Sequence, residues 1–323
     1  MGTDVGVIEP KLATSTRRAR PRWRAKLDRS VSPYAYVAPF FVIFGVFSVF
    51  PILYTSWVSL HNWDIIGEHS WAGFENYRVL FTDPRFWGAV QNTFSIFIIS
   101  AVPQLLLALV LAHILNERVL RGRTFFRMSL LVPNITSIAA VAIIFASIFS
   151  VRWGVVNWLL SLVGINQVDW LVNRTASHVA IASMVMWRWT GYNALIYLAA
   201  LQAIPRDLYE AASIDGAGRW GQFRHVTIPG IRPAIIFTII ISTIGSLQIF
   251  TEPLLFAPGA QVGITGGSSR QFQTLSLFMY EQAFRRFEFG YASAIAWMLF
   301  IIIALAAAVN YLIFRRIQGA GAD

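Results

Sequence analysis

Two apolar stretches of the chain carry aromatic, hydroxyl and amide side chains at helical spacing. In the first, Trp189, Tyr192 and Asn193 share one stripe of a helix. The second carries small and polar residues, namely Ser242, Gly245, Ser246, Gln248 and Glu252. Aromatic faces pack against C–H surfaces, and hydroxyl and amide groups hydrogen-bond to hydroxyl groups. Together they predict a pathway for a neutral, hydroxyl-rich solute such as a sugar. The alternative is an aromatic belt beside small-residue contacts between membrane helices.

The same two stretches contain one charged residue each, Arg188 and Glu252. Their opposite charges suit an ion pair that lines the pathway, and they suit a purely structural ion pair equally well. A proton or sodium symporter would be expected to place a relay of Asp, Glu or His inside the membrane. The scarcity of such groups favours a passive pathway that a partner protein opens.

Several kinds of chemistry are missing from the sequence. The only lysines are Lys11 and Lys26, and neither follows a glycine, so no phosphate-binding loop of the Gly-Lys-Ser/Thr type exists. The chain has no cysteine and only five scattered histidines, which predicts no metal site. We therefore expect a non-enzymatic protein that binds no cofactor itself and whose energy comes from another polypeptide.

The composition is that of a membrane protein. Hydrophobic residues make up 56% of the 323 residues and charged residues only 13%, whereas soluble domains carry about 25% charge. A soluble enzyme, a disordered protein and a nucleic-acid binder are therefore disfavoured.

Stretches long enough to cross about 30 Å of hydrocarbon as helices predict an all-α membrane protein with six transmembrane helices. They cover residues 34–60, 88–116, 128–151, 176–203, 233–257 and 290–314. These stretches lack the alternation of apolar and polar residues and are too long for the strands of an outer-membrane barrel.

Lys and Arg are distributed unequally between the two sides of these spans. The side with both termini carries 18 of them and the other side 7, which predicts cytoplasmic N- and C-termini. The N-terminal segment mixes Arg with Trp23, which suits anionic lipid headgroups at the membrane surface. The general preference of Lys and Arg for the cytoplasmic side of membrane proteins explains most of the positive charge of this segment without any specific lipid.

The loop between the fourth and fifth predicted spans reads as a helical hairpin. Pro205 suits a first helical turn, Gly216 stops the first helix, and a second short helix is expected to end at Pro229. We expect the first helix to pack against Leu208 and Trp220. The alternative is an interfacial loop that merely tucks under the bundle.

This loop resembles the motif of binding-protein-dependent ABC importer permeases. Glu210-Ala211-Ala212 is followed after three residues by Gly216, and after nine more by Val226-Thr227-Ile228-Pro229. In that family the segment is a coupling helix that docks in a groove of the cytoplasmic ATPase. The residues that would couple this chain to the ATPase are Glu210, Ala211, Ala212, Asp215, Gly216 and Pro229.

Two further stretches resemble the carbohydrate branch of that family, the maltose- and cellobiose-type first permease subunits. They are Gly73-Phe74-Glu75-Asn76-Tyr77 and the last loop, with Thr265-Gly266-Gly267 and Gly290 to Ala294; a proline usual after the glycines is missing. The resemblance implies a type I importer fold and a disaccharide or oligosaccharide of the cellobiose, maltose or trehalose class. Tyr192 and Ser242 fall where that family contacts sugar.

The resemblance also implies partners and a location. The partners are a second permease subunit in a heterodimer, two ATP-binding subunits, and an extracytoplasmic sugar-binding protein or lipoprotein. We expect a multi-pass protein of the bacterial cell membrane that contacts lipid and no nucleic acid. Its expected parts are a basic tail (1–33), a first transmembrane helix with an external loop (34–87), a permease core (88–314) with the coupling loop at 205–230, and a C-terminal tail (315–323). The rival functions are an ABC permease for a non-sugar solute and a secondary transporter.

Overall fold

The structure is a computed structural model that describes residue 2 and residues 22–63, 69–116, 122–257 and 260–319. The chain divides into two compact units, residues 1–55 and 56–323. Helices dominate the described residues, and a short antiparallel pair joins β1 (His61–Asn62) to β2 (Ser70–Trp71), with His61 opposite Trp71. The predicted all-α class is confirmed.

The first unit is described from residue 22, as one long helix that includes a π turn and whose last residues, 56–59, belong to the second unit. α1 spans Arg22–Phe44, the π turn η1 spans Gly45–Val49, and α2 spans Phe50–Ser59. Within it, Val31–Ser59 is long and apolar enough to cross a membrane. The helix begins at Arg22, inside the segment expected to be a tail.

Both described π turns lie two residues before a proline. The turn η1 precedes Pro51, and η2 (Phe223–Thr227) precedes Pro229. A proline ring clashes with the carbonyl four residues earlier, which here lies inside the π turn, where the helix is widened. The helix therefore continues through each proline. The prediction that Pro229 ends a helix is wrong, because α10 (Arg219–Gln222), η2 and α11 (Ile228–Leu247) run on as one helix over Arg219–Leu247.

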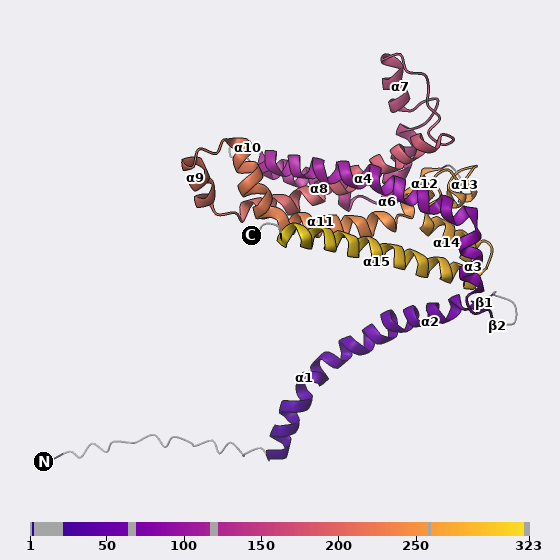
Figure 1. Cartoon of the computed structure of the whole chain (residues 1–323), viewed down its shortest axis with the longest axis horizontal. Helices are drawn as coiled ribbons and strands as arrows, with labels where there is room; N and C mark the ends of the chain where they lie inside the picture. The colour runs from indigo at the N-terminus through magenta and orange to yellow at the C-terminus, as the bar shows by residue number, and fades with distance from the viewer. Residues whose placement is uncertain (1, 3–21, 64–68, 117–121, 258–259, 320–323) are drawn as a thin grey trace. The chain divides into compact units, whose positions relative to one another are not determined.

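The second unit is a bundle whose long helices lie side by side (Figure 1). α4 (Pro84–Asn116) packs along α8 (Arg174–Gln202), α11 contacts both, and α15 (Phe289–Gly319) contacts α11. Small buried residues, including Ala108, Ala112 and Ala194, form part of the core where α4 and α8 meet, which allows close approach of the two helices. These helices form the frame that positions the candidate site.

The two ends of this bundle differ. α9 (Arg206–Ile214), α10 and the last turns of α15 lie at one end, here called the α9 end (Figure 1). The other, the α14 end, carries α3 (Glu75–Thr82), α12 (Thr251–Phe256), α13 (Ala260–Thr265) and α14 (Leu275–Phe284). One further short helix, α7 (Val155–Leu162), stands to the side of the bundle.

The third predicted span, 128–151, is not one straight helix. It consists of α5 (Arg123–Ile135) and α6 (Ile138–Ile148), which are bent by 93°. Thr136 and Ser137 between them have extended ψ angles of 142° and 126°. α5 packs tightly on α8, because a Cβ at Gly191 would lie only 2.0 Å from the carbonyl oxygen of Leu130.

The fifth predicted span also ends earlier than expected. α11 stops at Leu247, and residues 248–250 separate it from α12. Phe250, with φ −134° and ψ −55°, precedes α12. Pro253 then occupies the first turn of α12, where the missing N–H costs no hydrogen bond. The predicted end at 257 is therefore wrong.

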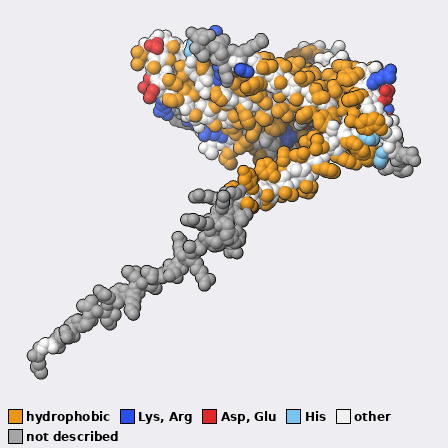
Figure 2. Space-filling model, turned by 60° about the horizontal axis from the view of Figure 1, so that its bottom comes forward, with side chains coloured by type: hydrophobic (Ala, Val, Ile, Leu, Met, Phe, Trp, Pro, Cys, Tyr) orange, Lys and Arg blue, Asp and Glu red, His pale blue; other side chains and the backbone are white. Residues whose placement is uncertain are grey.

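Four helices of the described chain are long and apolar enough to cross a membrane, and the bent pair α5–α6 makes a fifth if it counts as one span. α8 has 29 residues but is not among them, and its sequence contains Arg174, His178 and Arg188. Figure 2 shows apolar side chains over the sides of the bundle and acidic side chains near its ends. Many large apolar residues on these sides are exposed, including Leu106 and Phe300. Such a surface suits lipid rather than water.

Candidate functional site

Three helices of the bundle bring polar side chains together around Ser242. The Oγ of Ser242 on α11 accepts hydrogen bonds from Asn193 Nδ2 on α8 and from Gln104 Nε2 on α4, both at 3.4 Å. Gln104 and Asn193 are buried, at 2% and 4% exposure. Bonds of this length are weak, and Ser242 retains its own hydroxyl proton for donation. We refer to Gln104, Asn193 and Ser242 as the Ser242 cluster.

Gln104 is missing from the residues selected by sequence reasoning. Its Oε1 is buried and has no hydrogen-bond partner among the described residues. A usable signal existed in the sequence, because Gln104 is an amide in the middle of an apolar stretch that can span a membrane. The cluster therefore contains a hydroxyl proton on the half-buried Ser242 and, among the described residues, an unsatisfied buried acceptor on Gln104.

The aromatic residues predicted for the pathway form a pair one helical turn apart on α8. The rings of Trp189 and Tyr192 meet edge to face with centroids 5.8 Å apart. Tyr192 is 38% exposed, so it presents apolar surface away from the packed core. Asn193 follows directly in the chain and belongs to the Ser242 cluster. The geometry thus puts aromatic and amide groups on neighbouring positions of one helix.

The remaining pathway residues are spread along the α14-end half of α11 and beyond it. Ser246 is buried, Gln248 is exposed, and nothing lies within 4 Å of a Cβ built on Gly245. Within the described part of the chain, none of these three residues makes a side-chain hydrogen bond to the Ser242 cluster. The structure therefore brings Asn193 and Ser242 together and leaves this second group outside the cluster.

Arg188 and Glu252 form an ion pair between α8 and α12. Arg188 Nη1 lies 3.7 Å from Glu252 Oε1, and the two side chains are 20% and 10% exposed. The Arg188 guanidinium also lies 5.9 Å from the centre of the Trp189 ring, a distance at which cation–π attraction operates. Since the two charges cancel, the pair adds no net charge beside the aromatic residues.

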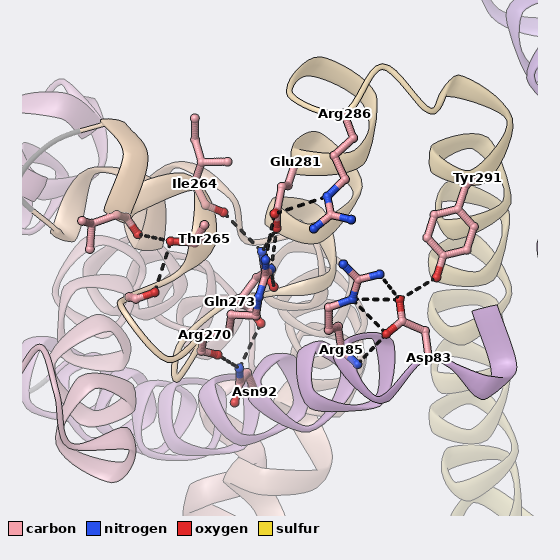
Figure 3. A network of polar contacts seen from close by, with 12 residues as sticks. Asp83, Arg85, Asn92, Ile264, Thr265, Arg270, Gln273, Glu281, Arg286 and Tyr291 are labelled. Atoms are coloured by element: carbon pink, nitrogen blue, oxygen red, sulfur yellow. Dashed lines mark hydrogen bonds and ion pairs between the residues drawn. The ribbon is translucent and has the colours of Figure 1, made fainter. Parts of the chain in front are cut away.

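A polar network closes the α14 end of the bundle (Figure 3). Glu281 on α14 accepts hydrogen bonds from Arg270 Nη2 at 2.8 Å and Gln273 Nε2 at 2.7 Å, and Arg286 lies 3.8 Å away. Asn92 on α4 donates to the carbonyl oxygens of Arg270 and Gln273. The loop that follows α13 is thereby tied to both α4 and α14.

The protonation of this network follows from its contacts. Burial alone would raise the pKa of Glu281, but the hydrogen bonds from Arg270 and Gln273 and the charge of Arg286 bring that pKa below its usual value. Burial likewise opposes ionisation of Asp83, but Arg85 and Tyr291 donate to it and the pKa of Asp83 falls below its usual value. Both carboxylates are thus held ionised.

At the α9 end, the loop of the Glu-Ala-Ala motif forms an exposed helical hairpin. α9 contains no buried residue; Glu210, Ala211, Asp215, Gly216 and Pro229 are exposed, and Ala212 is half-buried. Gly216 follows the helix with a φ of +82°, which glycine adopts without strain. The loop forms a stable turn that presents the motif residues outward.

Few contacts hold α9 against the bundle. Tyr209 Oη lies 3.0 Å from Thr227 Oγ1 in η2, and a hollow of about 1220 Å³ lies between the hairpin and the ends of α4 and α8. Leu208 and Trp220 are 52% and 72% exposed, so much of their apolar surface is not covered by the rest of the hairpin, and the expected packing of the motif segment against them stays a prediction. Their apolar surface, with that of Ile214 at 87% exposure, remains available to another protein.

Comparison with known proteins assigns the chain to a family. Residues 82–319 match the family described as the inner membrane component of binding-protein-dependent transport systems. The chain belongs to this family. The resemblance seen in the Glu-Ala-Ala loop is thereby confirmed, and this family is one of transport permeases rather than enzymes.

Its relatives include several named sugar permeases. The chain is 37% identical over 311 residues to the lactose transport system permease LacF of Rhizobium radiobacter, which covers 94% of this chain and 99% of the relative. It is 32% identical to the trehalose/maltose permease MalF of Thermococcus litoralis, with 88% and 94% covered. It is 31% identical to the arabinooligosaccharide permease AraP of Bacillus subtilis, with 91% and 92% covered.

A solved structure supports the fold of this permease. A chain of a bacterial ABC transporter that imports the polysaccharide alginate superposes with a TM-score of 0.77 at 24% identity, covering 92% of this chain and 99% of that one. The helical arrangement described above is thus that of an ABC importer permease.

Proposed function

We propose that this permease is one half of the translocation pathway of an ATP-driven sugar importer, for a disaccharide or oligosaccharide. The observation that carries the proposal is the Ser242 cluster beside the Trp189–Tyr192 pair. Hydroxyl and amide groups from α4, α8 and α11 converge inside an otherwise apolar bundle. A sugar matches such a site, because its ring offers C–H faces for aromatic residues and hydroxyl groups for polar ones.

The names of the relatives support the same class of solute. Lactose, trehalose or maltose, and arabinooligosaccharides are all neutral saccharides of two or more units. In this chain the charges of Arg188 and Glu252 cancel each other at 3.7 Å, which suits a neutral solute. A permease of the same family for an ionic solute is the second candidate, and it would require the pair to open toward its ligand.

Coupling to ATP hydrolysis would go through α9. Its exposed motif residues and the apolar surface of Leu208 and Ile214 suit docking in a groove of a cytoplasmic ATPase. The helix that follows Gly218 continues from α10 through η2 to Leu247. A displacement of the α9 hairpin would therefore be transmitted to Ser242, because the helix is continuous from α10 to the end of α11.

In the proposed assembly this chain crosses the membrane six times: four spans are the long apolar helices, the fifth is the bent pair α5–α6 and the sixth is α8. The α9 end and both termini lie in the cytoplasm. The other members are a second permease, two ATPase subunits that bind ATP and magnesium, and an extracytoplasmic sugar-binding protein. One solved alginate transporter was captured with its oligosaccharide-bound periplasmic protein. This precedent supports a binding protein as a partner, and in the proposed orientation that protein would approach the α14 end.

The test is uptake by the complex purified from native membranes and reconstituted in vesicles. Lactose, maltose, trehalose and cellobiose are offered in labelled form, with ATP inside the vesicles and the co-purified binding protein outside. We expect ATP-dependent uptake of at least one. Replacing Ser242 by Ala should weaken the apparent affinity about fivefold, since one hydrogen bond contributes about 1 kcal/mol.

The matched control is Ser129→Ala on α5, because within the described residues that exposed hydroxyl donates only to the Phe125 carbonyl of its own helix. It should leave uptake unchanged. Uptake driven by an ion gradient without ATP would identify a secondary transporter and overturn the proposal. ATP-dependent uptake of an amino acid or a polyamine, with none of the four sugars moved, would favour the second candidate.

A further inference from the structure

The segment around α7 is a hairpin that leaves the side of the bundle (Figure 1). It runs from the end of α6 at Ile148 through α7 to Trp170, shortly before α8 begins at Arg174. We call residues 149–170 the α7 hairpin. No role in the proposed sugar pathway or in ATPase coupling involves it.

A single buried amide holds the hairpin together. Asn157, 4% exposed, donates to the carbonyl oxygens of Val151 and Val168, both at 3.0 Å. Its Oδ1 accepts from the Val168 backbone N–H and from Trp170 Nε1 at 3.0 Å. With donors and acceptor satisfied, both legs are fixed, and α7 is a rigid element rather than a loose loop.

The foot of the hairpin lies at the α14 end of the bundle. The Phe149 ring contacts Trp170 at 4.9 Å and Phe256 of α12 at 6.5 Å. Gly154, just before α7, packs so closely that a Cβ would lie 2.5 Å from the Ile148 carbonyl oxygen. A compact turn of residues 149–154 therefore connects the end of the apolar helix α6 to the start of α7.

The surface of α7 is apolar and uncharged. No charged residue occurs between Arg152 and Asp169. Several large side chains there are strongly exposed, namely Trp153 (89%), Trp158 (60%), Leu159 (50%), Leu162 (65%) and Val163 (72%). Trp next to Leu and Val on a short helix at the end of a membrane span is typical of a segment that lies in the membrane interface.

We propose that the α7 hairpin is embedded in the lipid interface at the α14 end and braces α6 and the start of α8 against the membrane. In the proposed orientation this is the outer leaflet. Lipid fits better than the soluble binding protein, because a partner that dissociates would return these apolar side chains to water in every transport cycle. Protein partners also favour a polar rim around an apolar centre, and α7 itself carries no charged residue for one, since Arg152 and Asp169 lie outside the helix on the two legs of the hairpin.

The absence of cysteine from the chain makes the test direct. A single cysteine at Leu159 carries a spin label in the complete complex, purified with its co-purifying subunits and placed in lipid nanodiscs. Collision of the label with oxygen, which concentrates in lipid, is compared with collision with a water-soluble nickel chelate. Leu305→Cys on α15, 61% exposed, is the lipid reference, and Glu75→Cys on α3 is the water reference.

We expect the ratio of oxygen to nickel accessibility at Leu159→Cys to exceed that at Glu75→Cys and to approach that at Leu305→Cys. Leu162→Cys, one turn further on, provides an independent second reading. A ratio equal to that of Glu75→Cys would overturn the proposal in favour of a water-exposed hairpin. Protection from both reagents would overturn it in favour of a protein partner, the second permease or the binding protein.

The leaflet alone rests on the proposed orientation, and it is tested separately. A membrane-impermeant thiol reagent added to intact cells should label Glu75→Cys. Labelling only after the cells are opened would reverse the orientation while leaving the measured lipid contact of α7 intact.

Discussion

The ion pair between Arg188 and Glu252 gives the sharpest test of how charge is tolerated beside the proposed pathway. Replacing Glu252 by Gln keeps the size of the side chain and leaves the Arg188 charge without its partner. Breaking a buried pair costs about 3–5 kcal/mol. The 3.7 Å separation and the 20% exposure of Arg188 point to the lower end, about 3 kcal/mol.

A second replacement separates a structural role from a substrate contact. In the Arg188→Met/Glu252→Gln double variant neither charge is left alone, so most of the lost stability should return. The assay is the thermal unfolding of the purified complex in nanodiscs, with sugar uptake measured on the same samples. We expect a large drop in melting temperature for Glu252→Gln, recovery in the double variant, and retained uptake of the neutral sugar.

The chain contains a matched control for this cycle. Arg78 and Glu75 on α3 are also 3.7 Å apart, but their side chains are 80% and 56% exposed. Glu75→Gln should leave the melting temperature unchanged, because exposed pairs contribute little. Equal melting temperatures for Glu252→Gln and Glu75→Gln would refute the reasoning about burial. A stable double variant that assembles but no longer transports would show that the charges contact the solute.

Three further variants test the fold and the coupling loop. Gly191→Val should abolish the folded complex, because its Cβ would lie 2.0 Å from a backbone oxygen of α5, whereas Gly88→Ala on α4 meets open space and should assemble normally in size-exclusion chromatography. Gly216→Val should lower ATP-dependent uptake while the complex still assembles, since a φ of +82° costs a β-branched residue about 1–2 kcal/mol. The control Gly218→Ala should transport normally, because Gly218 has a φ of −66°. Full uptake by both variants would contradict the role of the turn. Since the pKa of Glu281 is lowered by folding, its stabilising contribution is complete above its usual value of 4.5 and is lost as the pH falls through the lower folded value. Glu281→Gln should therefore flatten the acid side of a plot of melting temperature against pH, and an unchanged acid limb would remove this carboxylate as its cause.

The location of Gln104 shows where sequence reasoning stopped short. Its polarity inside an apolar helix was visible, but its partner Ser242 lies 138 residues away on another helix. Asn193 and Ser242 were selected from their separate helical stripes, and their contact at 3.4 Å depends on how α8 and α11 pack. Convergence of three helices is a property of packing, and no local pattern reports it.

Proline had different outcomes at different places, for the same reason. Pro205 lies directly before α9, one position earlier than the first helical turn in which it was expected, and a missing N–H is harmless at a helix start. Pro229 does not end its helix, because a π turn accommodates the ring and the helix continues to Leu247. Whether a proline breaks, bends or merely widens a helix depends on the packing of the surrounding turns.

The sequence by itself determined the features that depend on local composition. The apolar lengths specify membrane helices, glycine at position 216 specifies the turn after α9, and the Glu-Ala-Ala spacing specifies the family. Only the tertiary structure decided the 93° bend between α5 and α6, the early end of α11 and the meeting of Gln104 with Ser242. The physical reason is the separation along the sequence of the residues that interact. Turns and hydrophobic lengths arise from residues that are neighbours in the chain, whereas bends and polar clusters arise where helices distant in the sequence approach each other.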